Sequence, residues 1–277
     1  MVTNNERTGA QLYDLHAGSA QRNWRLAGRF IEVATQIGGA MLKPTAVLGA
    51  LTLVSLAVAG PAGAQTGADQ TRLTVKVEVT PNKAGTKRNP QGVKLRVLAT
   101  WDHPAGIERP VISRAFVWFP RGSLYNGGKY PRCSKRTLDR KGPSGCPARS
   151  LMGRATGVAW ADTVRTKPRI VIVNGGRSKV WLYTTLYRPA LVREPVPMYV
   201  KRTRGKWAYK ARIVVPRALQ VVAGVPVALS RFSSTAGRGK WLATTGCPKS
   251  RRWKLKVRTD YAAGGSSTFT DSIRCRR

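Results

Sequence analysis

The sequence predicts an all-β protein built as an antiparallel β-sandwich of the immunoglobulin-like or jelly-roll-like kind, with two disulfides. Apolar and polar residues alternate along most of the chain after residue 70, which is typical of strands with one buried face. Turn residues interrupt this pattern every ~10–15 residues, and no long segment has helical periodicity. Short strands joined by turns favour a sandwich over a sheet with crossover helices.

The strands are expected in the following order. Leu73–Val79 and Val93–Val97 alternate apolar residues with charged or hydroxyl residues, so each has one exposed face. Val111–Phe119 is more continuously apolar and is expected to be buried on both faces. Further strands are expected over residues 170–173, 180–187, 207–215 and 225–232.

The chain is expected to close with a β-hairpin. Apolar and polar residues alternate over Trp253–Tyr261, an Ala-Ala-Gly-Gly turn follows, and a second strand covers Thr268–Ile273. Two short helices are predicted over residues 134–140 and 218–222. Trp118, Trp181 and Trp207 lie in predicted strands and are candidate core residues.

An export signal is predicted before the β-rich region. Lys43 is followed by an apolar run over residues 46–59 and by the small-residue site Ala62-Gly63-Ala64. The run is too short to span a bilayer, which needs ~20 residues. We therefore expect residues 1–40 to be an unfolded upstream extension, residues 41–64 to be a signal peptide for the general secretory route, and residues 65–277 to be one secreted domain.

The charge is strongly basic. The chain carries 49 Lys and Arg against 12 Asp and Glu, a net charge of +37, and +35 remains after residue 64. Such a surface attracts polyanions with strong salt dependence, and the rival interpretation is a surface that is merely solubilising.

Four cysteines, all after residue 64, predict two disulfides in an exported protein. Three connectivities are possible, and we predict Cys133–Cys146 and Cys247–Cys275. The first bridge would close a polar loop, and the second would enclose the C-terminal hairpin. A zinc site is disfavoured because no two cysteines have the close C-x2-C spacing.

Three stretches resemble a group of uncharacterised secreted actinobacterial proteins. They are Pro131–Gly157, with its P-x-C-S…C-P-x-x-S-x-x-G block, Val227–Ser250, with a late T-G-C-P block, and the closing hairpin to Cys275. The opening segment Val79–Val97 extends the likeness over most of the secreted part. The resemblance supports the β architecture and the cysteine pairing, and it implies no activity.

Basic residues cluster in two regions for which we predict polyanion binding. Lys254, Lys256 and Arg258 would project from one face of a strand. The complete predicted set is Lys201, Arg202, Arg204, Lys206, Lys249, Arg251, Arg252, Lys254, Lys256 and Arg258. The expected partner is an anionic cell-wall polymer or an acidic polysaccharide. No aromatic signature or finger spacing indicates dedicated nucleic-acid recognition.

The predicted function is therefore a secreted, non-enzymatic protein that associates with anionic polymers of the cell envelope or extracellular matrix. No catalytic, cofactor-binding or metal-binding residue is predicted. His103, beside Asp102, is the sole histidine after residue 64 and is interpreted as a surface residue. Two alternatives remain open: an envelope hydrolase using a carboxylate pair or a Ser–Lys dyad, and a purely structural surface protein.

Overall fold

The computed structural model describes residues 70–276. The predicted extension over residues 1–40 and the predicted signal peptide over residues 41–64 lie outside this part. In chain order the elements are β1 (Arg72–Thr80), β2 (Gln91–Gly92), β3 (Lys94–Asp102), β4 (Ile112–Pro120), β5 (Ser123–Tyr125), η1 (Gly127–Lys129), α1 (Lys135–Lys141), η2 (Gly142–Gly145), η3 (Ala148–Ser150), β6 (Leu151–Ala161), β7 (Val164–Thr166), β8 (Arg169–Asn174), β9 (Lys179–Leu186), β10 (Val192–Arg202), β11 (Trp207–Val214), α2 (Arg217–Gln220), β12 (Val221–Val222), β13 (Val225–Ala236), β14 (Leu242–Thr244), β15 (Arg252–Tyr261) and β16 (Ser266–Arg274).

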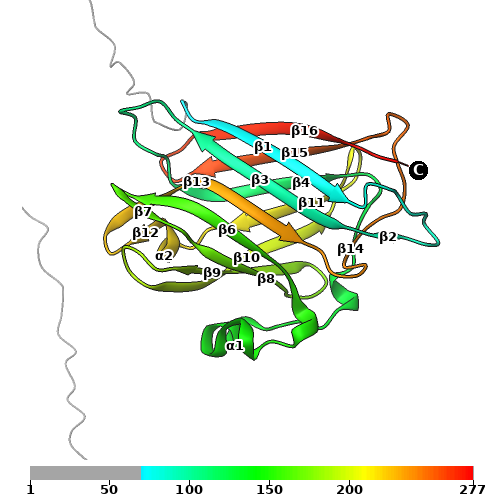
Figure 1. Ribbon diagram of the computed structural model, residues 1–277, viewed down its shortest axis with the longest axis horizontal. Helices are drawn as coiled ribbons and strands as arrows, with labels where there is room; N and C mark the ends of the chain where they lie inside the picture. The colour runs from blue at the N-terminus through cyan, green and yellow to red at the C-terminus, as the bar shows by residue number, and fades with distance from the viewer. Residues whose placement is uncertain (1–69, 277) are drawn as a thin grey trace, which may run out of the picture. The chain divides into compact units, whose positions relative to one another are not determined.

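One antiparallel sheet makes up most of the fold. Its strands follow the order β1-β3-β13-β6-β8-β9-β10-β11-β4-β15-β16. Two short strands are added to this order: β7 pairs with β6, and β12 pairs with β13. The sheet curls until its first and last strands lie side by side, which gives a nearly closed, barrel-like sandwich (Figure 1). The prediction of an all-β antiparallel fold with two disulfides is confirmed.

Hydrogen bonds at both ends of β1 and β16 hold this seam together. At one end the Ser267 hydroxyl donates to the carbonyl oxygen of Thr71 over 2.8 Å. At the other end the Arg276 N–H donates to the Asn82 carbonyl, and the Ala84 N–H donates to the Arg276 carbonyl, each over 2.8 Å. Closure covers the two edges that an open sheet would present to other chains.

The period-two pattern places apolar side chains inside the barrel and polar ones outside. The predicted C-terminal hairpin is confirmed as β15 and β16, with Leu255 and Val257 buried. The prediction that Val111–Phe119 is buried on both faces is wrong. On β4, Val117 points into the barrel, whereas Arg114 and Trp118 lie on the outer surface.

Strand β10 was not expected from the sequence, because Pro195 and Pro197 interrupt its pattern. Backbone N–H groups along a strand point alternately to its two neighbours. The Val200 N–H donates to the Ser178 carbonyl just before β9, so the even-numbered residues of β10 point their N–H groups toward β9. Positions 195 and 197 are odd-numbered and therefore face the β11 side. On that side, pairing with β11 begins only at Met198. The missing N–H groups of the two prolines therefore cost no ladder hydrogen bond.

The Cys133–Cys146 loop covers part of the barrel's outer surface. Its helix α1 is N-capped by the Ser134 hydroxyl, which accepts a hydrogen bond from the Thr137 N–H, so the predicted helix over residues 134–140 is confirmed. Leu138 is fully buried, and together with the disulfide it packs on Trp181 of β9. The second short helix is also present, as α2.

Both predicted cysteine pairings are confirmed, and the first gives a stability prediction. Replacing Cys133 and Cys146 with serine should lower the free energy of unfolding by about 3 kcal/mol, because the bridge closes a loop with a sequence separation of 13. Denaturant unfolding of the double variant against wild type measures this difference. An unchanged denaturation midpoint would contradict it.

A second, small sheet with the order β2-β14-β5 lies at one end of the barrel (Figure 1). Trp241, directly before β14, is 2% exposed, and its ring meets that of Tyr125 edge-on at 5.5 Å between ring centroids. Burial raises the pKa of Tyr125 far above its ordinary range. Within residues 70–276, no helix has the length and apolar content needed to cross a bilayer.

A basic–aromatic face as the candidate functional site

The ten predicted polyanion-binding residues lie on two parts of the sheet. Lys201 and Arg202 end β10, and Arg204 and Lys206 lie in the turn to β11. Lys249 and Arg251 precede β15, and four more residues lie on β15 itself: Arg252, Lys254, Lys256 and Arg258. In the sheet only β4 separates β11 from β15, so the fold brings the two predicted regions together across one strand.

Two rows of side chains cross this part of the outer surface. Residues that pair directly across neighbouring strands project on the same side of the sheet. The first row runs through Lys201, Lys210, Trp118 and Lys256 on β10, β11, β4 and β15. With strands about 4.8 Å apart, Lys201 and Lys256 are separated by about 14 Å along the row.

In this row, lysines flank the indole of Trp118. The Lys210 ammonium lies 4.9 Å from the Trp118 ring centroid, and the Lys256 ammonium lies 5.2 Å from it. Lys210 also lies 4.5 Å from the ring centroid of Phe116. Each such contact contributes about 0.5–1 kcal/mol at an exposed site, and the rings thus hold closely spaced ammonium groups in place.

The second row lies two residues further along each strand. It runs through Lys179, Tyr199, Arg212, Phe116 and Arg258 on β9, β10, β11, β4 and β15. Tyr199 is 37% exposed, with Lys179 and Arg212 each 5.3 Å from its ring centroid. We call these two rows together the basic–aromatic face.

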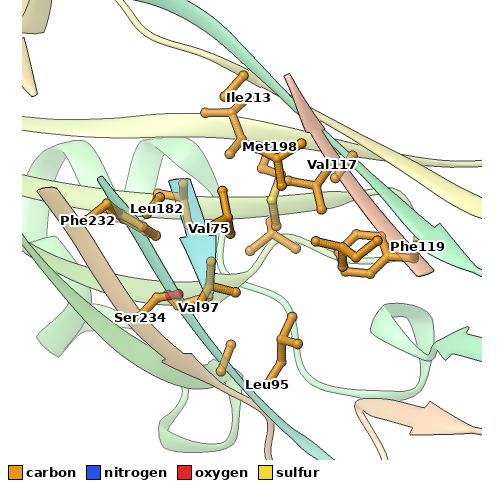
Figure 2. Close-up of a pocket in the computed structure, with 18 of the residues that line it drawn as sticks. Val75, Leu95, Val97, Val117, Phe119, Leu182, Met198, Ile213, Phe232 and Ser234 are labelled. Atoms are coloured by element: carbon orange, nitrogen blue, oxygen red, sulfur yellow. The ribbon is translucent and has the colours of Figure 1, made fainter. Parts of the chain in front are cut away.

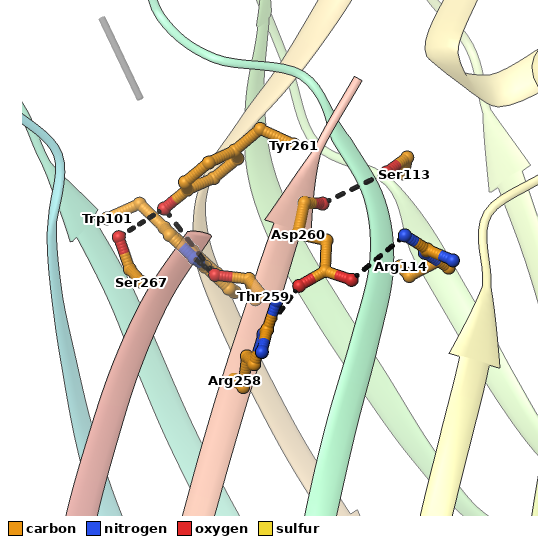
Figure 3. Close-up of polar contacts among 8 residues, drawn as sticks. All are labelled: Trp101, Ser113, Arg114, Arg258, Thr259, Asp260, Tyr261 and Ser267. Carbon is orange, nitrogen blue, oxygen red and sulfur yellow. Dashed lines mark hydrogen bonds and ion pairs between the residues drawn. The ribbon is translucent and has the colours of Figure 1, made fainter. Parts of the chain in front are cut away.

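An acidic residue marks one border of the face. Asp260 is buried, and its carboxylate accepts a hydrogen bond from Arg258 Nε over 2.7 Å and pairs with Arg114 over 3.2 Å (Figure 3). The two guanidinium groups and the carboxylate leave one net positive charge. The charge of Arg258, although exposed, is therefore engaged by an acid of the protein, whereas no acid pairs with Lys201, Lys210 or Lys256 among the ion pairs of the described residues.

The Arg252 end of β15 is also engaged internally. The Arg252 guanidinium donates to the hydroxyl and the carbonyl oxygen of Ser272 on β16, over 2.8 and 3.1 Å. Arg121 anchors the Arg204–Lys206 turn, because its Nε donates to the Gly205 carbonyl over 2.5 Å. The turn thus stays beside the end of β4.

Sequence reasoning missed the members of the face contributed by β4 and β11. Lys210 and Arg212 alternate with buried Tyr209 and Ala211, and this alternation was the available signal. Trp118 was predicted as a core residue, which is wrong, because its ring lies outside between two lysines.

The two other candidate core tryptophans differ from each other. Trp207 is partly exposed, with the Lys206 ammonium 5.8 Å from its ring, so its assignment to the core is also wrong. Trp181 is buried as predicted, although it lies beneath the cysteine loop rather than inside the barrel.

Several acids that a hydrolase would need are paired with bases. Lys135 binds Asp139 at 2.8 Å, and this hydrogen bond raises the pKa of Lys135. Glu78 pairs with Arg96 at 3.5 Å. Across residues 70–276, no three His, Cys, Asp or Glu side chains are grouped in a way that would hold a metal ion.

Comparison with protein-family models, with curated proteins and with solved structures gives no match to this chain. The resemblance to secreted actinobacterial proteins stays a prediction.

Proposed function

We propose that the protein is secreted and non-enzymatic, and that it binds an anionic polymer of the cell envelope through the basic–aromatic face. The observation that carries this proposal is the row in which Lys201, Lys210 and Lys256 share one surface with Trp118. Disulfides form and persist outside the reducing cytoplasm, and both bridges in this chain agree with export.

The spacing of the cations favours a polymer over a small anion. The two rows lie about 7 Å apart, and the longer spans about 19 Å from β9 to β15. A single phosphate or carboxylate would reach one or two of these groups, whereas a chain of repeated anionic units can neutralise several at once. Each neutralised site releases counterions, and this release supplies the affinity.

The aromatic rings support recognition of a sugar-containing polymer. Tyr199 is the most exposed ring of the face, and Trp118 and Phe116 are partly exposed between the lysines. The amphipathic rings of Tyr199 and Trp118 offer an apolar surface beside the charged groups. We therefore propose that phosphate- or carboxylate-bearing wall polymers and acidic polysaccharides are the ligand class.

The hydrolase alternative has less support. A pair of catalytic carboxylates requires two acids facing a common space, whereas Asp260, Asp139 and Glu78 each form an ion pair with a base. A purely structural role predicts no saturable binding, and the same experiment separates it from our proposal.

Retention on purified cell wall tests the proposed function. We expect strong retention near ~50 mM salt that falls steadily towards ~500 mM, with log affinity linear in log salt concentration. Retention that does not depend on salt, or no retention at the lowest salt, would contradict the proposal. Release of wall fragments during the incubation would favour the hydrolase.

A further inference from the structure

The interior of the barrel is not filled by its side chains. It contains a cavity of about 340 Å³, lined by residues from opposite walls of the barrel. Figure 2 shows Val75, Val97 and Phe232 from β1, β3 and β13 on one wall, and Met198 and Ile213 from β10 and β11 on the other.

This volume is far larger than ordinary packing defects. Protein interiors are close-packed, and few of their voids exceed the size of a water molecule. Ligand pockets typically measure about 300–1,000 Å³, so the cavity falls within that class.

The lining is apolar in a chain that is otherwise strongly basic. Among the described residues that line the cavity, none is Asp, Glu, Lys, Arg or His. Val, Leu, Ile and aromatic side chains dominate it. Apolar cavities of this kind do not hold water well and take apolar ligands instead.

One fully buried polar atom in the lining lacks a partner. The Thr244 hydroxyl on β14 is buried, and no group among residues 70–276 bonds to it. It lies on the small end sheet, where Thr244 pairs with Ser123 of β5, and both residues line the cavity. An unpaired buried hydroxyl is costly, and a ligand atom that bonds to it would remove that cost.

We propose that the barrel binds one uncharged amphiphile, which is an apolar chain ending in a hydroxyl or carbonyl group. The chain would fill the space between the walls, and its polar end would bond to the Thr244 hydroxyl. A charged head group is disfavoured because the lining offers no counter-charge, and burying an unpaired carboxylate is very costly.

This site is independent of the polymer-binding proposal. On β4, Val117 points into the cavity, whereas Trp118 lies on the basic–aromatic face outside. Either proposal can fail without affecting the other.

Straight-chain alcohols from hexanol to hexadecanol serve as probes, with the matching fatty acids at neutral pH for comparison. We expect one alcohol of intermediate length to bind tightest, since the cavity has a fixed volume. A concentration of 100 times its Kd should raise the melting temperature by about 5–10 °C. Tighter binding of the ionised acid than of the alcohol would overturn the uncharged-head assignment.

Filling the cavity tests the location. Val117→Phe should reduce affinity for the best alcohol at least 10-fold, because the ring would occupy ligand space. Circular dichroism and an undiminished melting temperature without ligand would show that the variant folds. Val164→Phe, at a position 41% exposed, is the matched control and should bind like wild type. Equal binding by both variants would place the ligand elsewhere and overturn the proposal.

The polar end is tested by a second matched pair. Thr244→Val should weaken binding of the same alcohol about 5-fold, the value of one hydrogen bond. Thr184 also lines the cavity, but its hydroxyl donates to the Leu182 carbonyl over 3.2 Å, so Thr184→Val should leave the affinity unchanged. Equal affinities for the two variants would remove Thr244 from the site, and no binding of any alcohol to folded wild type would overturn the whole proposal.

Discussion

Replacing Asn174 with alanine is expected to lower the free energy of unfolding by about 3–5 kcal/mol, the largest stability effect that we predict. Asn174 ends β8 and is completely buried. Its two amide N–H groups are shared among the carbonyl oxygens of Gly127, Tyr130 and Pro131, which lie 2.9–3.2 Å from the nitrogen. The residue thereby ties the segment before the first disulfide to the sheet.

The amide oxygen of Asn174 binds two aromatic side chains at one end of the barrel. It accepts hydrogen bonds from the indole N–H of Trp241 over 3.2 Å and from the Tyr125 hydroxyl over 3.3 Å. An alanine would leave the buried indole N–H and several carbonyl groups unpaired, and each such group costs about 1–3 kcal/mol.

Thermal and denaturant unfolding of Asn174→Ala measures the loss, which corresponds to about 10 °C in melting temperature. The control is Asn89→Ala, because Asn89 is exposed and accepts only from Lys240 through its side chain. We expect the control to lie within about 0.5 kcal/mol of wild type. Equal stabilities of the two variants would refute the role of Asn174.

Reversing three charges of the basic–aromatic face should abolish polymer retention. We expect K201E/K210E/K256E to reduce affinity about 100-fold or more at low salt. Each basic group near an anionic surface contributes about 1 kcal/mol, and reversal replaces attraction with repulsion. Retention on purified cell wall measures the loss. All three side chains project outward, so the fold should be unaffected.

A second triple variant separates position from net charge. Lys76, Lys94 and Arg231 are exposed on β1, β3 and β13, outside the face: β16 separates β1 from β15, and β3 and β13 lie further round the sheet. The variant K76E/K94E/R231E changes the net charge by the same amount. It should retain most of the affinity, so equal losses in the two triples would mean that total charge, and not the face, controls binding.

Much of the local structure was predictable from the sequence because it depends on neighbouring residues, although the central strand β6 was not expected. The alternation over Trp253–Tyr261 predicted β15, and the short helix predicted over residues 134–140 is present as α1. Strand β10 was missed because Pro195 and Pro197 disfavour strands unless the sheet spares their missing N–H groups. The two prolines are tolerated because β11 pairs with β10 only from Met198 onward. Where β11 ends relative to β10 is a property of the tertiary structure.

Closure of the sheet and its consequences were not predictable. Strand β13 lies between β3 and β6, and β1 meets β16 near the end of the chain, so the pairing is decided by contacts far apart in sequence. The same pairing aligns Lys201, Trp118 and Lys256 in one row. Clusters of charge in the sequence revealed the outer parts of this face but not the members on β11 and β4 that join them.

Lysine footprinting tests the location of the polymer most directly. Purified protein is treated with an amine-acetylating reagent with and without saturating wall polymer, and modified peptides are quantified by mass spectrometry. We predict that the polymer protects Lys201, Lys210 and Lys256 several-fold, while Lys76 and Lys94 react at unchanged rates. Equal protection of all five lysines, or protection of Lys76 and Lys94 alone, would contradict the assignment of binding to the basic–aromatic face.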